Sequence, residues 1–359
     1  MRPAEPASGG LLLVPVSGGD GSGELQRARL LARSARIRWP RMPIAIAAAA
    51  SSLAGCRDHD IEYLPLPASP TRCTREVAAL IAARRPALTL FDSTARPAQM
   101  AAATAVGAGV VYLSSRPSAR RRGFRPGAFA RIDEHWSVEF DPDGRLPNLL
   151  QQLMLRLRPA LRWRAFGSLH ETADATRLPP AVRDFVTTGP YAVFCPGGGG
   201  GQVDGLASPA AYTQAAMRSG LRAVCVRADH APGSAEIDGS TLTLGPLDNA
   251  ALMALLQGCE IAVLAAGSLL LQALSCGAPC IAVPLAGDQG KRLRLLAARE
   301  AVVASDATVP ALADAASRLW RDAAERARLR QRASALGLAN GLDAALDAMS
   351  RWLGLATGG

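Results

Sequence analysis

Residues 255–297 read LLQGCEIAVLAAGSLLLQALSCGAPCIAVPLAGDQGKRLRLLA, in which short apolar runs alternate with turns of small residues. The run Ile261–Leu264 predicts a strand that ends at a Gly-Ser turn, and Leu269–Cys276 has the apolar spacing of a helix. Another apolar run, Cys280–Val283, predicts the next strand. Strand, helix and strand in this order are typical of a parallel sheet that is covered by helices.

The same alternation extends over most of the chain. We expect further strands at Leu11–Val16, Pro43–Ala48, Ile61–Leu64, Ala87–Phe91, Gly109–Leu113, Ser137–Phe140, Tyr191–Cys195, Ala223–Arg227 and Thr241–Leu244. We expect further helices at Glu24–Arg38, Arg75–Arg84, Ala98–Val106, Pro209–Arg218, Asn249–Gly258, Asp288–Arg299 and, broken only near 337–341, from Thr308 onward. This order predicts an α/β fold of two Rossmann-like domains that face each other across a cleft.

The domain boundaries are expected where the alternation stops. Residues 156–190 contain four prolines and little periodicity, so we place the linker within this segment, near its end. This predicts an N-terminal domain over residues 1–170 and a C-terminal domain over residues 185–335. A final helical segment, residues 336–359, can cross back onto the N-terminal domain.

Each half opens with a strand that runs into a cluster of glycines. Four glycines lie between residues 18 and 23, and five consecutive glycines occupy residues 197–201. Neither cluster has the spacing of a dinucleotide-binding motif or a P-loop. One interpretation is a flexible turn. The other is that a ligand approaches the backbone there, at the start of a helix, where free N–H groups favour an anion.

The chain is long and basic. Its 359 residues, 49% of them hydrophobic, suffice for two domains with sizeable cores. The formal net charge is +10, and every basic residue except Lys291 is an arginine. This balance favours anionic partners such as nucleotides, phosphates or anionic lipid. A GC-rich coding bias also explains part of the abundant arginine, alanine and glycine.

Cysteine usage and the length of the apolar runs indicate the compartment. The seven cysteines are scattered without a C-x-x-C pair, which favours reduced thiols in a cytoplasmic protein. The apolar runs are too short for a signal peptide or a membrane-spanning helix. We therefore expect a cytoplasmic protein, for which attachment to the inner face of the membrane stays open.

Residues 241–300 resemble the nucleotide-sugar half of GT-B glycosyltransferases. The likeness rests on the Gly-Ser turn, the helix after it, the sequence CGAP at 276–279 and the Asp-Gln pair at 288–289. Within that group the chain is similar to the peptidoglycan N-acetylglucosaminyltransferase family and to the UDP-sugar hydrolase of pseudaminic acid synthesis. The sequence GSGELQR at 21–27 resembles the first loop of these proteins more weakly.

The resemblance implies a nucleotide-sugar site in the C-terminal half. Gly267, Ser268 and Leu269 would hold a diphosphate at the start of a helix, where backbone N–H groups are free. Gln272 stands where the family usually has a glutamate that binds the ribose hydroxyls. The other residues that the resemblance implies are Gly198, Gly199, Leu244, Asp288 and Gln289. A plain helix cap or surface position is the alternative interpretation for Ser268, Gln272 and the Asp-Gln pair. No cofactor beyond the nucleotide sugar, itself a co-substrate, is implied.

Glycosyl transfer also needs a base that deprotonates the acceptor. The family often uses a histidine of the first loop, and Glu24 occupies that position here. Glu24 and Asp20 are therefore the candidate catalytic residues, although Glu24 can also simply favour the start of a helix. Asp92 follows an apolar strand and either contacts the acceptor or caps a helix. Two D-x-D triplets, at 58–60 and 141–143, are interpreted as solvated turns, so no metal site is expected.

Residues 116–131 contain six arginines and two phenylalanines. Three interpretations stay open. The segment is a solvated loop, or it binds nucleic acid, which the lack of the usual aromatic RNA-binding motifs disfavours. The third is that it contacts anionic lipid or a phosphate-bearing acceptor. The residues of that contact would be Arg120, Arg121, Arg122, Phe124 and Arg125.

These features together predict a metal-independent GT-B glycosyltransferase. It would move a hexosyl or N-acetylhexosaminyl group from a nucleotide sugar, UDP-linked by resemblance, to a bacterial glycan or lipid-linked acceptor. A nucleotide-sugar hydrolase is the first alternative, because one fold supports both reactions. The second is a noncatalytic binding partner, since Glu24 and Gln272 depart from the family pattern.

Overall fold

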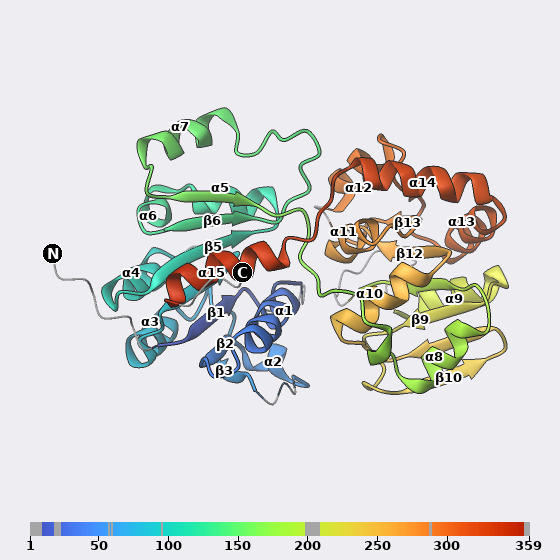
Figure 1. Ribbon diagram of the computed structural model, residues 1–359, viewed down its shortest axis with the longest axis horizontal. Coiled ribbons are helices and arrows are strands. Elements are labelled where there is room, and N and C mark those ends of the chain that lie inside the picture. The colour runs from blue at the N-terminus through green and yellow to red at the C-terminus, as the bar shows by residue number, and fades with distance from the viewer. Residues whose placement is uncertain are drawn as a thin grey trace. The chain divides into compact units, whose positions relative to one another are not determined.

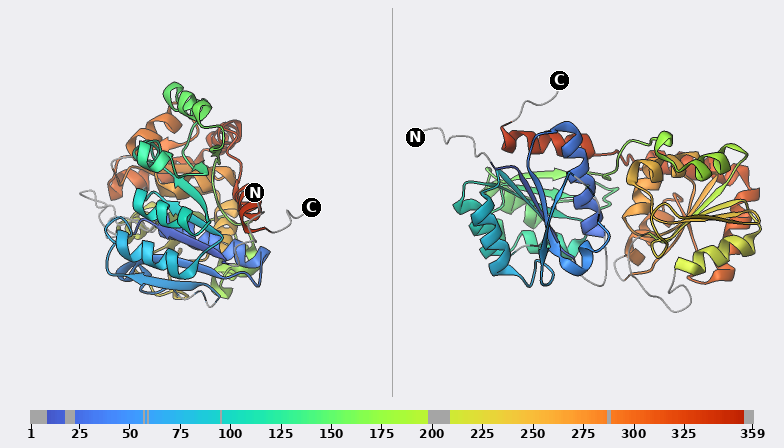
Figure 2. Two further views of the ribbon diagram at one scale, coloured as in Figure 1. Left: turned by 90° about the vertical axis from the view of Figure 1, so that its left-hand side faces the viewer. Right: turned by 90° about the horizontal axis from the view of Figure 1, so that it is seen from below.

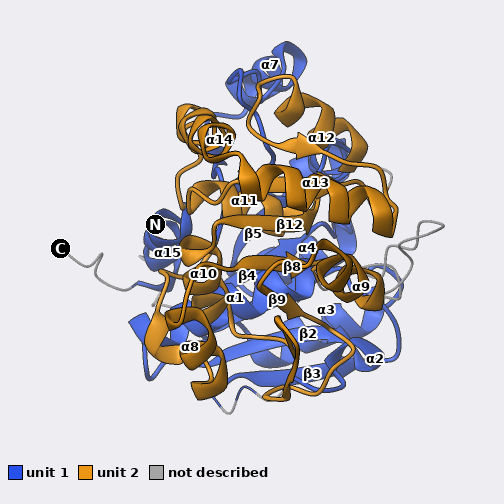
Figure 3. Cartoon of the chain, turned by 90° about the vertical axis from the view of Figure 1, so that its right-hand side faces the viewer, with its two compact units in different colours: residues 1–169, 341–359 blue, residues 170–340 orange. Residues whose placement is uncertain are grey.

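A computed structural model describes residues 9–17, 23–56, 58, 60–94, 96–197, 209–286 and 289–354. The chain divides into two compact units, which Figure 3 colours separately. Unit 1 comprises residues 1–169 and 341–359, and unit 2 comprises residues 170–340. Both units are α/β, as the alternation of apolar runs predicts.

Unit 1 contains a sheet of seven parallel strands in the order β3-β2-β1-β4-β5-β6-β7 (Figure 1). The strands are β1 (Leu11–Pro15), β2 (Ile44–Ala49), β3 (Glu62–Leu66), β4 (Leu88–Asp92), β5 (Gly109–Ser114), β6 (Glu134–Ser137) and β7 (Arg162–Ala165). The order runs outward in both directions from β1 and β4. These neighbours therefore form the point where the topology switches, at which open α/β sheets bind ligands.

The helices of unit 1 cover both faces of this sheet. They are α1 (Gly23–Arg38), α2 (Ala50–Leu53), α3 (Thr74–Arg84), α4 (Pro97–Ala105), α5 (Pro117–Gly123), α6 (Pro126–Phe129), α7 (Leu149–Leu157) and α15 (Leu342–Leu353). Successive residues of β1 point to opposite faces, so Leu11 and Leu13 pack in one apolar core and Leu12 and Val14 in the other. The C-terminal helix α15 packs beside α1 over the first of these cores (Figure 2).

Unit 2 repeats the plan with its own sheet, in the order β10-β11-β9-β8-β12-β13-β14. The strands are β8 (Ala192–Cys195), β9 (Ala223–Val226), β10 (Ala235–Asp238), β11 (Thr241–Leu244), β12 (Ile261–Ala265), β13 (Cys280–Val283) and β14 (Val303–Ala304). All pairs are parallel except β10 with β11. The helices are η1 (Ala175–Arg177), α8 (Pro180–Thr187), α9 (Pro209–Ser219), α10 (Asn249–Gly258), α11 (Ser268–Ser275), α12 (Gln289–Ala297), α13 (Val309–Arg321) and α14 (Ala323–Ala335). Here β8 and β12 are the neighbours at the switch.

Unit 2 starts at His170, within the segment in which the sequence shows little periodicity. Glu171 attaches this segment to the start of α10 in two ways. Its backbone N–H donates to Asn249 Oδ1 at 2.7 Å, and its Oε2 accepts from the N–H of Ala250 at 2.9 Å. Because these contacts are polar, the segment has no hydrophobic pattern from which its attachment to unit 2 could be predicted.

Three details of the predicted secondary structure are wrong. The strand expected at Ser137–Phe140 lies at Glu134–Ser137 instead and is followed by β7 in the same sheet; it was misplaced because its buried residues include the polar Glu134 and His135. The segment 156–190 contains β7, η1 and α8, which the sequence analysis left without structure. The C-terminal helical region has an additional break at Asp322, whose side chain accepts from the N–H of Glu325 at 2.8 Å and caps α14.

Candidate functional site

In unit 2, the predicted diphosphate turn lies at the carboxyl end of β12, beside the switch between β8 and β12. Gly267 is the N-cap of α11, and no side chain caps this helix within the described part of the chain. Ser268 is exposed, Gly267 and Leu269 are half-buried, and the first turn carries no acidic residue. Uncapped N–H groups and a partial positive charge make this turn suited to an anion.

Two residues of α12 approach the same turn. A Cβ placed on Gly267 would lie 3.7 Å from Nε2 of Gln289, so the amide of Gln289 lies beside the turn. Gln289 Oε1 accepts from the N–H of Leu285 at 2.8 Å, which fixes the orientation of that amide. Arg292 Nη1 donates to the carbonyl of Ala266 at 2.8 Å. The sequence analysis missed Arg292, which brings a positive charge to the predicted diphosphate position.

The structure connects Gln272 with the start of α10. Its Oε1 accepts from Asn249 Nδ2 at 3.3 Å, and Asn249 in turn accepts from the N–H of Glu171. The side chain of Gln272 is half-buried and lies one turn after Ser268 on α11. Its role as a ribose ligand stays a prediction, and Asn249 is the neighbour that would orient it.

The remaining residues predicted for the nucleotide sugar divide into two groups. Leu244 ends β11, where its side chain is buried and its carbonyl accepts from the N–H of Arg227 at 2.9 Å. The side chain and the carbonyl of Leu244 are therefore engaged in the fold, and its contact with a base stays a prediction. Gly198, Gly199 and Asp288 lie outside the described residues, as does the candidate base Asp20.

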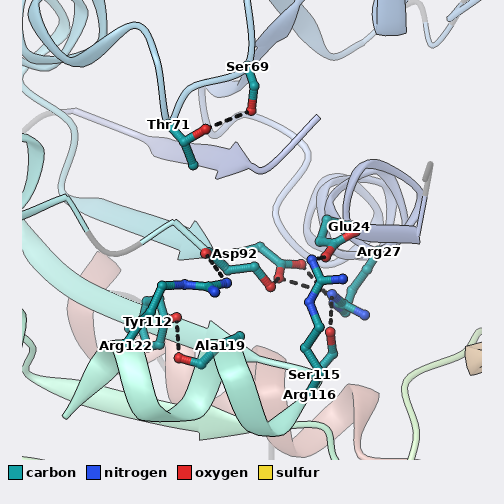
Figure 4. Close-up of polar contacts among 11 residues, drawn as sticks. Glu24, Arg27, Ser69, Thr71, Asp92, Tyr112, Ser115, Arg116, Ala119 and Arg122 are labelled. Carbon is teal, nitrogen blue, oxygen red and sulfur yellow. Dashed lines mark hydrogen bonds and ion pairs between the residues drawn. The ribbon is translucent and has the colours of Figure 1, made fainter. Parts of the chain in front are cut away.

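In unit 1, a buried ion pair occupies the switch between β1 and β4. Asp92 ends β4, and its carboxylate accepts from Arg27 Nε at 2.7 Å and from Nη2 at 3.0 Å (Figure 4). Arg27 Nη2 also donates to Ser115 Oγ at 3.2 Å. Burial raises the pKa of Asp92 to about 6, although the Arg27 guanidinium opposes this shift. Asp92 is a buried partner of Arg27 and does not cap α4, whose N-cap is Arg96, while its contact with an acceptor stays a prediction.

The candidate base Glu24 lies one turn before Arg27 on α1. Its Oε1 accepts from Arg116 Nη2 at 2.8 Å (Figure 4). Glu24 is largely buried, and Arg116 is half-buried, so this pair is partly shielded from water. Glu24 therefore lies at the same sheet edge as Asp92, held by an arginine of the segment 116–131. Its catalytic role stays a prediction.

A cavity of about 390 Å³ opens at this edge and is rich in arginine. Its lining residues are Val16, Thr71, Ser93, Arg96, Arg122 and Arg125. Backbone carbonyls hold two of the arginines, since Arg96 Nε donates to Thr71 O at 2.9 Å and Arg122 Nη2 to Ser93 O at 3.2 Å. Among the described residues, no carboxylate pairs with these two or with Arg125. The cavity therefore carries uncompensated positive charge.

The backbone beside this cavity is strained. Ser93, which follows Asp92, has a φ of 62°, in the left-handed region that a serine seldom adopts. Its N–H donates to Leu113 O at 2.9 Å, and its carbonyl accepts from Arg122. Strain of this kind is retained where surrounding contacts hold it, often at functional sites.

The segment 116–131 folds into α5 and α6 instead of forming a solvated loop. Arg120 is buried and forms an ion pair with Glu139. Phe124 is buried too and stacks on Phe129 with ring centroids 5.7 Å apart. Phe124 is thus not available to a lipid surface, and Arg121, Arg122 and Arg125 are the accessible members of the predicted patch.

The other polar candidates have structural partners. His135 is buried, its Nε2 lies 3.0 Å from Ser114 Oγ, and burial lowers its pKa to about 3. Asp58 pairs with Arg29 and Arg33, and Asp141 accepts from the N–H groups of Arg145 and Leu146. Among the residues that the structure describes, no group of three or more His, Cys, Asp or Glu is arranged to hold a metal ion. The seven cysteines are unbridged.

Solved structures with similar folds were found across almost the whole chain. One of them is Arabidopsis thaliana UGT89C1, which was solved with quercetin, with UDP and with UDP-L-rhamnose. Its quercetin complex is 15% identical to this chain, and the alignment covers 96% of this chain and 99% of that chain with a TM-score of 0.62. Spinosyn forosaminyltransferase SpnP is 15% identical over 91% of this chain and 95% of that chain, with a TM-score of 0.58. The calicheamicin glycosyltransferase CalG4 is 12% identical over 96% of this chain and 98% of that chain, with a TM-score of 0.56.

The fold is GT-B. The predicted α/β fold with two Rossmann-like domains is thereby confirmed. The nearer resemblance to the peptidoglycan N-acetylglucosaminyltransferase family and to the UDP-sugar hydrolase is not shown by these neighbours. No family model matches the chain, and the curated proteins yield no match either. Each helix in the described ranges is too short or too polar to span a lipid bilayer.

Proposed function

We propose that this protein is a glycosyltransferase that takes its sugar from a UDP-linked donor. The observation that supports this most is the uncapped N-terminus of α11 at the switch of unit 2, in a chain whose fold neighbours include complexes with UDP and UDP-sugars. In this proposal the N–H groups of Gly267, Ser268 and Leu269 bind the diphosphate. Gln272 binds the ribose, while Gln289, with Asp288, binds sugar hydroxyls.

The reaction is a displacement at the anomeric carbon of the donor sugar. The acceptor hydroxyl forms the new bond to that carbon, its proton passes to Glu24 or Asp20, and the bond to the UDP oxygen breaks. Negative charge then collects on the departing diphosphate. The α11 N-terminus and Arg292, held on the Ala266 carbonyl, stabilise this charge, so the proposed reaction is metal-independent.

The arginine-lined cavity of unit 1 indicates which chemical groups the acceptor carries. Arg96, Arg122 and Arg125 line a space of about 390 Å³ at the edge that also holds Glu24 and Asp92. A guanidinium group pairs with phosphate or carboxylate through its planar fork. We therefore propose an acceptor that carries such a group, either a bacterial glycan or a lipid-linked sugar. Both hexosyl and N-acetylhexosaminyl donors fit the proposal.

Calorimetry with UDP tests the donor site. We expect wild-type protein to bind UDP and Ser268→Glu to bind it about tenfold more weakly, because the new carboxylate lies beside the diphosphate. Ser268→Gln is the matched control, since it changes size without adding charge, and it should retain most of the affinity. Absence of UDP binding at millimolar concentration would support the noncatalytic alternative.

Turnover separates transfer from hydrolysis. Wild-type protein is incubated with UDP-sugars, first alone and then with phosphate-bearing glycans as acceptors. A glycosylated product supports transfer, whereas free sugar and UDP at equal rates in both arms support hydrolysis. Glu24→Gln and Asp20→Asn are tested in the same assay, and full rates in both would exclude these residues as bases.

A further inference from the structure

Helix α7 of unit 1 exposes its apolar side chains. The exposed fractions are 83% for Leu149, 67% for Leu150, 53% for Leu153 and 78% for Leu157. Leu150, Leu153 and Leu157 have the spacing i, i+3, i+7, so they form one stripe along the helix. Figure 1 shows α7 at the border of unit 1, joined to the sheet by extended segments on both sides.

The inner side of α7 is the more polar one. Gln151 is buried, and its side chain and that of Asn148 form a reciprocal capping box at the start of the helix. The capping box therefore fixes the start of this helix, Leu155 packs against the core of unit 1, and the other four leucines point outward. A contiguous apolar stripe on a soluble surface indicates a surface that another body covers.

The stretch of chain that contains the stripe is rich in arginine. Residues 145–164 contain five arginines and no acidic residue. Three of the five are engaged elsewhere, Arg145 with Asp143 and Arg162 and Arg164 with Glu134. In the described ranges no carboxylate pairs with Arg156, which is exposed, or with Arg158, which donates to the carbonyl of Phe129. These two lie at the C-terminal end of the leucine stripe.

We propose that α7 docks this protein on an anionic lipid surface. The leucine stripe enters the boundary between headgroups and acyl chains, and the arginines at the helix end contact the anionic headgroups. A protein partner would satisfy the leucines, but it gives no reason for the exposed Arg156 beside them, with which no described carboxylate pairs, in a chain with a net charge of +10. The proposal does not depend on the proposed sugar transfer.

Sedimentation of the full chain with vesicles tests this proposal. We expect binding to vesicles of phosphatidylglycerol with phosphatidylcholine, weaker binding in high salt, and little binding to phosphatidylcholine alone. Leu150→Gln with Leu157→Gln should lower the partition coefficient at least about tenfold, because two exposed leucines lose their burial in lipid. Arg156→Gln should lower it about fivefold, and only with the anionic vesicles.

Ile37→Gln is the matched control. Ile37 is 71% exposed in unit 1 but stands alone on α1, so its replacement should leave vesicle binding unchanged. The variants alter exposed residues, so their thermal unfolding should match the wild type, and circular dichroism verifies this. Failure to sediment with anionic vesicles, or equal binding by the double leucine variant, overturns the proposal. So does light scattering that finds a lipid-free dimer which the double variant converts to monomer, because a second copy then covers α7.

Discussion

Beyond β12 of unit 2 the chain turns through small uncharged residues, whereas β4 of unit 1 ends in a buried aspartate, Asp92. Both positions are the switch point of a doubly wound sheet, β8 beside β12 in one unit and β1 beside β4 in the other. At the first, Gly267 and Ser268 leave backbone N–H groups uncapped within the described residues. At the second, two carboxylates are each held by an arginine.

This difference shows that the same sheet topology can present either free backbone N–H groups or paired ionisable side chains at its switch point. Unit 2 offers fixed backbone dipoles, which bind an anion and do not change with pH. Unit 1 offers two carboxylates that are each paired with an arginine, Glu24 and Asp92, and burial raises the pKa of Asp92 to about 6. The proposed donor site therefore needs no ionisation to work, whereas the proposed acceptor side does. Each experiment below tests one side of this contrast.

The largest effect is expected from Arg27→Gln. This change leaves the buried Asp92 without its ionic partner, and breaking a buried pair in this way costs about 3–5 kcal/mol in the free energy of unfolding at neutral pH. Urea unfolding measures it. Arg29→Gln, on the same helix, is the control, because Arg29 and its partner Asp58 are less buried and should cost about 1 kcal/mol or less. Equal losses in both variants would contradict a special role for the switch.

Asp92 should make the stability of unit 1 depend on pH. Its pKa is about 6 in the folded state and near 3.8 when unfolded, so the folded state binds its proton more tightly. The contribution of Asp92 to stability is therefore present below about pH 4 and is lost as the pH rises through 6, by about 3 kcal/mol in all. Urea unfolding of the wild type and of Asp92→Asn from pH 4 to 8 isolates this change. A difference that stays constant with pH would show that Arg27 fully offsets the burial of Asp92.

The third test concerns the leaving group. Arg292→Gln removes the guanidinium from the turn at Ala266, and we expect kcat to fall about a hundredfold, because charge develops on the diphosphate as the bond breaks. UDP affinity should change much less, since the α11 N–H groups remain. Lys291→Gln is the control, an exposed neighbour that should keep its full rate. If UDP affinity and kcat fell by the same factor, Arg292 would act in binding UDP and not in stabilising the leaving group.

Most central strands and the long helices of both units could be predicted from the sequence, because their cores are built from apolar residues with regular spacing. The turn at Gly267 and the helix after it were predicted for the same reason. The sequence did not reveal β6, because Glu134 and His135 are buried polar residues whose partners, Arg164 and Ser114, lie in other elements. Nor did it reveal α7, because four of its five leucines are exposed and only Leu155 packs against the core.

The candidate site was predictable only where it depends on local sequence. Arg292 was missed since arginine is abundant throughout the chain, and nothing in the sequence marks the one that reaches the Ala266 carbonyl. The pairs Arg27–Asp92 and Arg116–Glu24 join residues 65 and 92 positions apart, and such distances become contacts only through the sheet topology. Arg122 and Arg125 belonged to a predicted basic patch, but their position at a cavity follows from the folding of α5 and α6.

The smallest effect tests the cavity of unit 1. Arg122→Gln with Arg125→Gln removes two of its three arginines, and binding of inorganic phosphate, measured by calorimetry, should weaken about fivefold. Arg121→Gln is the matched control, because Arg121 is an exposed arginine of α5 that does not line the cavity. The double variant should still bind UDP with wild-type affinity, since the diphosphate turn lies in unit 2. Loss of UDP affinity together with phosphate affinity would instead mean that one site serves both anions, and the contrast between the two units would fail.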